Sequence, residues 1–345
     1  MISTSKISKY ILQRENAKRH SSAYIKKRLK TIIISVLRYS LIICLSYMIL
    51  YSLLQLISAS FTHPYDIGST SSVWIPQSIT LDNIKVAYTI MKYPKAFLYT
   101  LGSTTVVMIL QMANAAFAGY SFARLRFRGS KLLFGLVILT IIVPPSSLML
   151  PQYIYFRNFD IFGICKILLG KELNLLGEPS SLFILSALGQ GLSSGLFVYI
   201  FCQFFRGLPK ELEEAAHVDG AGFLRTFFRI VLPTAKPSFM TVGVLSFVWN
   251  WNDTYFPRLF NPTDNYLRVR LATLSTPSGG SSAVQVAIGN SISKIPPDTI
   301  KLASSAYDSV ILKAGSLLAI IPLIIFFLII QKQFVEGVER SGIVG

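Results

Sequence analysis

The chain has 345 residues, of which 52% are hydrophobic and 14% are charged, and its formal net charge is +17. A typical soluble domain carries about 25% charged residues, so this composition argues against one large soluble core and indicates several membrane spans. A strongly positive chain binds either nucleic acid or a membrane surface. The basic residues flank apolar runs, which favours the membrane.

Six apolar segments are long enough to cross a bilayer, which takes about 20 residues. They are residues 32–58, 96–119, 131–154, 181–205, 236–256 and 312–331. The first is too long and lies too far along the chain for a cleavable signal peptide, so we expect it to remain as an anchor. The predicted fold is therefore an all-α membrane protein with six transmembrane helices.

Lysine and arginine predict which side of the membrane each loop faces. They gather in the first 30 residues, in the turn after the second span and in the loop after the fourth span. With six spans these regions share one side with the C-terminus, so both termini are predicted to be cytoplasmic. The predicted divisions are a basic tail at 1–31, the first transmembrane helix at 32–58, an external loop at 59–95, a five-helix core at 96–331 that includes the loop 206–233, and a C-terminal tail at 332–345. Residues 155–180 and 257–311 are then external too.

The loop between the fourth and fifth spans contains an acidic segment rich in small residues, from Glu211 to Gly220. Acidic residues in a first turn stabilise a helix through its dipole, and a glycine can end a helix in the left-handed conformation. A second short helix, with Phe223, Phe227 and Ile230 at helical spacing, is expected to pack this unit against the membrane domain. An exposed acidic helix between two membrane spans indicates a partner that docks onto it from the aqueous phase.

The spacing of this loop resembles the signature of binding-protein-dependent ABC importer permeases. All of its fixed positions are present: Glu214, Ala215, Ala216, Gly220, Ile230, Leu232 and Pro233. The resemblance implies that the segment is the cytoplasmic coupling helix, which docks onto a separate ATPase subunit. Glu211 and Asp219 are predicted to belong to the same docking surface.

Residues 183–257 resemble permeases of carbohydrate-importing ABC systems, and the C-terminal tail resembles that of the smaller maltose-transporter permease. The resemblance implies a bacterial plasma-membrane protein that imports a sugar or oligosaccharide. Its expected partners are a second homologous permease, two ATPase subunits and an external solute-binding protein. The sequence contains no phosphate-binding loop, so we expect ATP to be used by the ATPase subunits and this chain to bind no cofactor and no metal.

A polar cluster, Asn250, Trp251 and Asn252, lies near the end of the fifth span. If that span begins near Pro237, Asn250 lies about 20 Å further along at about 1.5 Å per residue. Polar side chains at such a depth usually face the bundle interior or an aqueous cavity. The three residues are therefore candidates for the substrate pathway, and anchoring of the helix end at the interface is the alternative.

Three other functions remain open. A permease of the same fold could carry an amino acid, a peptide or an ion. A membrane-embedded enzyme would need paired ionisable residues inside the spans, which contain almost none. A nucleic-acid-binding arm is disfavoured because the positive-inside rule accounts for the basic tail. Gly189, Gly191 and Gly195 nearly match a dinucleotide fingerprint, but they lie in an apolar span, where small residues indicate close helix packing.

Overall fold

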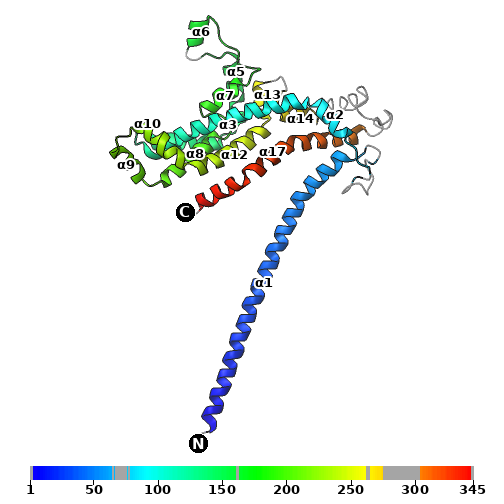
Figure 1. Ribbon diagram of the computed structural model, residues 1–345, viewed down its shortest axis with the longest axis vertical. Helices are drawn as coiled ribbons and strands as arrows, with labels where there is room; N and C mark the ends of the chain where they lie inside the picture. Colours follow the sequence, from blue (N-terminus) through cyan, green and yellow to red (C-terminus); the bar gives the residue numbers. More distant parts are fainter. Residues whose placement is uncertain are drawn as a thin grey trace.

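The computed structural model describes residues 3–63, 66, 76, 78–160, 163–261, 265–274 and 304–342. Over these residues the protein is built from α-helices, with two isolated β-bridges. The body is a bundle of four helices: α3 (Tyr93–Arg124), α8 (Ser194–Gly207), α12 (Lys236–Asn252) and α17 (Ser304–Gly342). Figure 1 shows α1 (Ser3–Phe61) extending away from this bundle as one long helix.

Three helices are long and apolar enough to cross a membrane: Arg28–Phe61 in α1, all of α3, and Tyr307–Lys332 in α17. Two bent helix pairs also qualify, Ser130–Ile142 with Pro145–Arg157 and Phe223–Thr234 with Lys236–Asn252. The described part of the chain therefore has three to five candidate spans. They coincide with five of the six predicted segments.

The remaining predicted span, residues 181–205, is not one continuous helix. It consists of α7 (Ser180–Ala187) and α8, separated by a break. Gly189 and Ser193 adopt left-handed backbone conformations in this break, with φ of +75° and +56°, and a right-handed helix cannot contain them. Gly191 also lies close to α3, since a Cβ there would be 2.5 Å from the amide nitrogen of Gln111. The prediction of an unbroken span is therefore wrong.

The three glycines of this region thus have different roles. Gly189 and Gly191 form the break, whereas Gly195 lies in α8 at the expected close helix contact. A Cβ on Gly195 would meet Thr140 and would lie 2.8 Å from the carbonyl oxygen of Val137. Close packing is found at all three glycines, since a Cβ on Gly189 or Gly191 would also meet a side chain of α3, but only Gly195 makes its contact from within a helix.

The third predicted span, residues 131–154, is bent. It comprises α4 (Ser130–Ile142), a 3-10 turn (Pro145–Leu148) and α5 (Met149–Arg157), and the two halves meet at 103°. The bend follows Val143, where two successive prolines, Pro144 and Pro145, remove backbone donors and prevent an uninterrupted helix. The predicted segment 131–154 is therefore a bent pair of helices and not one continuous helix.

Each segment predicted as an external loop contains a short helix: α2 (Asp82–Ile90) in 59–95, α6 (Ile164–Leu169) in 155–180 and α14 (Leu267–Leu274) in 257–311. α2 and α14 pack on α17, and their apolar side chains share one core cluster with Trp251. This burial depends on contacts between distant segments, which a local sequence pattern does not reveal. Residues 275–303, with the glycine-rich and proline-rich pieces of the predicted loop, lie outside the described residues.

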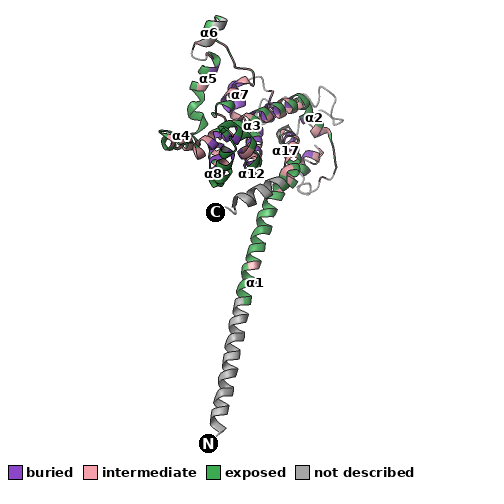
Figure 2. Cartoon of the chain, turned by 60° about the vertical axis from the view of Figure 1, so that its left-hand side comes forward, coloured by how far each residue is buried: buried purple, intermediate pink, exposed green. Residues whose placement is uncertain are grey.

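Apolar surface remains exposed on two helices outside the bundle. Figure 2 shows α4 and the described part of α1 as largely exposed, while buried residues concentrate in α3, α8 and α12. In α1 none of the most apolar 18-residue window is buried inside the chain. These two surfaces are suited to contact with lipid or with another membrane protein.

A close approach of α3 and α8 predicts that Gly119 tolerates no side chain. A Cβ there would lie 2.6 Å from Phe201 Cβ and 2.9 Å from the backbone nitrogen of Cys202. Gly119→Ala should therefore push the helices apart, cost about 1–3 kcal/mol and lower the Tm in detergent. Gly102→Ala is the matched control in the same helix, because nothing lies within 4 Å of its Cβ position. Equal Tm values for the two variants would contradict the close contact.

Candidate functional site

The predicted acidic helix is present at one end of the bundle, beyond the end of α8 (Figure 1). α9 runs over Glu211–Val218, with three glutamates in its first turn. It ends as expected at Gly220, whose φ is +75°. The N–H of Ala221 donates to the carbonyl oxygen of Ala216 at 2.9 Å, which is the bond that closes a helix when a left-handed glycine follows it.

Most of the predicted docking residues lie on the outer surface of this loop. Five of them are exposed: Glu211, Glu214, Ala215, Asp219 and Gly220. Pro233 is exposed as well, while Ile230 and Leu232 are half-buried. Ala216 is only 3% exposed, so it packs α9 against the rest of the chain and offers no surface to a partner.

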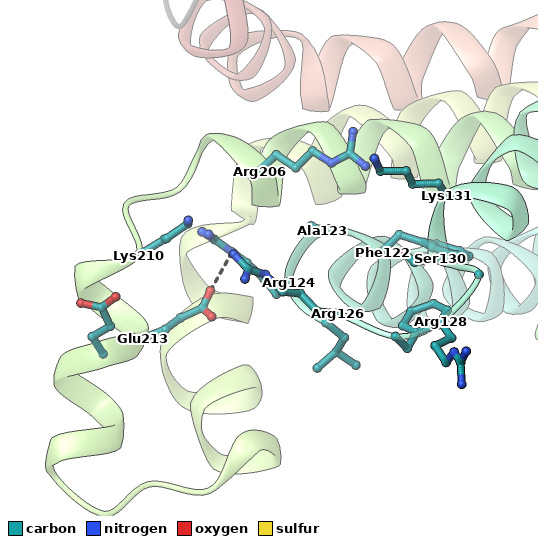
Figure 3. Close-up of a pocket in the computed structure, with 14 residues that line it drawn as sticks. Phe122, Ala123, Arg124, Arg126, Arg128, Ser130, Lys131, Arg206, Lys210 and Glu213 are labelled. Carbon is teal, nitrogen blue, oxygen red and sulfur yellow. Dashed lines mark ion pairs between the residues drawn. The ribbon is translucent and has the colours of Figure 1, made fainter.

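An ion pair with little exposure attaches α9 to the end of α3. Arg124 Nε lies 2.9 Å from Glu213 Oε1, and the two side chains are 9% and 18% exposed (Figure 3). The second nitrogen of the guanidinium, Nη2, donates to the carbonyl oxygen of Leu208 at 2.6 Å. The hydroxyl of Tyr120 lies 3.5 Å from the other Glu213 oxygen. The acidic helix is thereby fixed in position from its inner side, and its outer carboxylates remain free to meet a partner.

Aromatic packing attaches the second half of the loop to the bundle. After α10 (Phe223–Thr226) the chain forms a π-helical turn (Phe227–Val231) and a short helix, α11 (Leu232–Thr234), that leads into α12. The ring of Phe227 is fully buried, with its centroid 5.0 Å from that of Phe117 and 4.9 Å from that of Tyr120. The loop is therefore attached to α3 through this ring and to α12 through α11.

The π-helical turn changes which side chains face inward. The expected inward positions were Phe223, Phe227 and Ile230, at ordinary helical spacing. The buried ones are Thr226, Phe227 and Val231, and Phe223 is exposed. The hydrogen bonds of a π turn join residues five apart, so the turn accommodates one extra residue. The extra residue rotates the helix beyond the turn, so that Val231 faces inward in place of Ile230.

The polar residues of α12 have three different environments. Asn250 is half-buried, and its amide donates to Gln111 Oε1 at 3.0 Å, which also accepts from Ser246 Oγ at 2.6 Å. Trp251 is 3% exposed, and its indole N–H donates to a backbone carbonyl of α17 at 3.3 Å. Asn252 is exposed and donates to the carbonyl oxygen of Val248 at 2.9 Å. The structure therefore places Trp251 in the core, and of the three predicted residues only Asn250 joins the polar network around Gln111.

That network is centred on α3. The Gln111 amide nitrogen donates to the carbonyl oxygen of Leu192 at 3.0 Å, in the break between α7 and α8. One buried glutamine thus connects α3, α12 and the broken span. Its side chain is 2% exposed.

Several residues of these two arrangements were missed by the sequence analysis. Arg124 was interpreted only through the positive-inside rule, and Glu213 adjoins the signature without belonging to it. Gln111 and Ser246 lie inside predicted spans, where a polar side chain usually faces the bundle interior. That signal was available in the sequence, whereas the Arg124 to Glu213 pairing requires the fold.

Metal ligands do not gather in the part of the chain that the structure describes: it contains no group of three His, Cys, Asp or Glu side chains that could hold an ion. The three cysteines, Cys44, Cys165 and Cys202, are free thiols. The polar groups around Gln111 and Arg124 instead join helices to one another.

Comparison with known proteins gives a consistent result. Residues 115–340 match the family model described as binding-protein-dependent transport system inner membrane component. The arabinooligosaccharides transport system permease protein AraQ of Halalkalibacterium halodurans is 26% identical over 87% of this chain and 93% of its own. The osmoprotective compounds uptake permease protein GgtD of Synechocystis is 30% identical over 72% of this chain and 70% of its own.

The fold is also similar to a solved structure. A bacterial ABC transporter involved in the import of the acidic polysaccharide alginate superposes with a TM-score of 0.64, covering 88% of this chain and 96% of the matched chain. The sequences are 16% identical, so this likeness concerns the fold alone.

The ion pair between α3 and α9 predicts coupled effects of its two residues. Arg124→Gln leaves a largely buried carboxylate without its partner, which typically costs about 3–5 kcal/mol, so the amides of α9 should exchange with solvent faster. Arg124→Gln with Glu213→Gln removes both charges and should cost less than the two single changes added together. Hydrogen exchange of the intact chain measures the opening of α9 in the single variants and in the double variant.

The matched control for this cycle is Glu214→Gln, at an exposed neighbour that forms no ion pair with another described residue. It should leave exchange in α9 close to that of the parent chain. If the free-energy costs of Arg124→Gln and Glu213→Gln simply add up in the double variant, the ion pair does not fix the helix.

Proposed function

The chain belongs to the family of binding-protein-dependent transport system inner membrane components, and from this we propose that it forms one half of the translocation pathway of an ABC importer for a sugar or oligosaccharide. The observation that carries the proposal is α9, an acidic helix that is exposed on one side and fixed by an ion pair on the other. A rigid, exposed element at the end of a helical bundle is suited to receive force from a docked partner.

The proposed substrate class rests on relatives. AraQ is named for arabinooligosaccharides and supports an oligosaccharide, whereas GgtD is named for osmoprotective compounds and supports a different small solute as the second candidate. A ligand screen on the solute-binding protein that co-purifies with the importer separates the two. Binding of an oligosaccharide supports the first candidate, and binding of a small osmolyte alone supports the second.

The proposed topology has six spans, with α7 and α8 together forming the fourth. Both termini, the turn at 125–129 and the loop 206–233 then face the cytoplasm. The Lys and Arg distribution supports this orientation, and so does the placement of α9 at the same end of the bundle as the C-terminal end of α3 (Figure 1). The predicted divisions at 1–31, 32–58, 59–95, 96–331 and 332–345 are retained as part of this proposal.

The proposed partners are a second permease, two ATPase subunits and an external solute-binding protein. The family description supports the last directly. The exposed carboxylates of Glu211, Glu214 and Asp219 provide the surface for an ATPase subunit, and the unpartnered apolar faces of α1 and α4 are available to lipid and a second permease.

The structure suggests how a partner's motion would reach the transport pathway. A push on α9 acts on α3 through the Arg124 to Glu213 pair and the Phe227 ring, and on α12 through α11. The Gln111 network then joins α3, α12 and the broken span further along the bundle. Closure of ATP-loaded ATPase subunits would move these helices together, which is the kind of rigid-body step that alternating access requires.

Reversing a charge on the docking surface should uncouple the importer. Glu214→Lys places a cation where the proposed partner meets a carboxylate, which can cost several kcal/mol. We expect solute uptake to fall at least tenfold at matched membrane levels, with less ATPase subunit retained in pull-downs. Glu172→Lys, an exposed reversal in the proposed external loop, is the control. Unchanged uptake with Glu214→Lys would contradict docking at α9.

Gly220 should be required for its backbone conformation. Gly220→Val forces a β-branched residue to adopt φ near +75°, which such residues strongly disfavour. Uptake should be lost while the chain still reaches the membrane. Gly222→Val is the matched control, because Gly222 has φ of −70° and no atom lies within 4 Å of its Cβ position. If Gly220→Val and Gly222→Val show the same solute uptake, the backbone conformation at Gly220 is not required for coupling.

Reporter fusions test the orientation. Fusions after Gly129 and Gly222 should report a cytoplasmic location, and a fusion after Gly170 should report an external one. A cytoplasmic signal at Gly170 would overturn the six-span topology.

A further inference from the structure

A basic groove of about 1050 Å³ lies where the turn after α3 meets the start of α4, the end of α8 and the first turn of α9 (Figure 3). Two carboxylates, Glu213 and Glu214, line it. Six cationic side chains also line it: Arg124, Arg126, Arg128, Lys131, Arg206 and Lys210. The groove therefore carries a clear excess of positive charge.

Most of this charge is not neutralised within the chain. Arg124 is paired with Glu213, whereas the other five cations form no ion pair with any described residue. Figure 3 shows the side chains of Arg206 and Lys131 pointing toward one another. The Arg206 guanidinium lies 4.9 Å from the centroid of the Phe134 ring, one turn beyond Lys131 in α4. Two converging like charges repel one another, so an anion between them would be stabilised.

Apolar surface adjoins the groove on its membrane side. α4 begins at the groove and exposes a row of leucines along its length, among them Leu132, Leu136 and Leu139. The turn itself alternates apolar and basic residues, and Leu125 and Phe127 are exposed. Interleaved basic and apolar side chains are typical of a segment at the boundary between lipid headgroups and acyl chains.

We propose that this groove binds the phosphate headgroup of an anionic glycerophospholipid, whose acyl chains lie along α4. Arginine and lysine donate strong charge-assisted hydrogen bonds to phosphate oxygens, and basic pockets between transmembrane helices hold such headgroups. A free phosphate ion would use the cations but not the leucines. An acidic surface of a soluble partner would likewise leave the apolar face of α4 uncovered, so the combination favours a lipid.

The test uses the assembled importer, purified in detergent and titrated with dioleoyl phosphatidylglycerol in native mass spectrometry. Arg128→Gln with Lys131→Gln should weaken binding about thirtyfold, since each cation near a lipid surface contributes roughly a fivefold change in affinity. Arg157→Gln with Lys171→Gln is the matched control: it removes one arginine and one lysine from exposed positions outside the groove, in the proposed external segment. It should change the affinity less than twofold, and Arg128→Lys with Lys131→Arg should retain binding.

Other outcomes would overturn the proposal. Equal affinity for phosphatidylcholine would show that charge is not recognised, and equal binding of glycerol 3-phosphate would indicate a site for free phosphate. An equal loss in the control variant would indicate general surface attraction. Loss of the ATPase subunit with lipid binding unchanged would assign the groove to that partner. Lipid binding is measured without any transported solute, so its failure is distinguishable from failure of the proposed transport function.

Discussion

The attachment of α9 depends on the ion pair between Arg124 and Glu213. A helix whose outer face carries exposed carboxylates buries little apolar surface of its own, so hydrophobic packing alone would hold it weakly. Ala216 and the Phe227 ring supply some burial, and the ion pair joins the last residue of α3 to the first turn of α9. A pair with so little exposure adds little net stability, because desolvation of the two charges offsets much of their attraction, whereas removal of one partner is costly.

The sequence predicted α9 well because its determinants are local. Acidic residues at its start and Gly220 at its end act within a few residues of chain, and a spacing pattern records them directly. The inner attachment could not be predicted in the same way. Arg124 and Glu213 are far apart in the sequence, as are Gln111 and Asn250, and only the packing of α3 against its neighbours brings each pair together. Hydropathy indicates that such polar residues face inward, without naming their partners.

Hydropathy located most of the candidate spans, but it did not reveal where their helices are broken. The count of apolar residues in 181–205 is the same whether the backbone is helical or broken, and the left-handed conformations at Gly189 and Ser193 are what interrupt it. The bend at Pro144 and Pro145 was visible in the sequence, because proline cannot continue a helix without losing a bond. The break brings the backbone carbonyl of Leu192 to the amide of Gln111, so this discontinuity provides a contact that a straight helix would not offer.

The basic residues around the end of α3 have two properties that need separate explanations: the side of the membrane they are predicted to face, and their convergence on one groove. The positive-inside rule predicts that they lie on one side of the membrane, but it does not explain why they converge. Arg124 is used internally, whereas Lys131 and Arg206 face one groove with no carboxylate between them. The end of α3 therefore contacts the acidic helix through Arg124 and also lines the basic groove, of which the first turn of α9 forms one wall. An anion bound in the groove would reduce the repulsion among the cations around Arg124 but would also face Glu213 and Glu214, which line the same groove, so occupancy of the groove and the attachment of α9 are electrostatically linked.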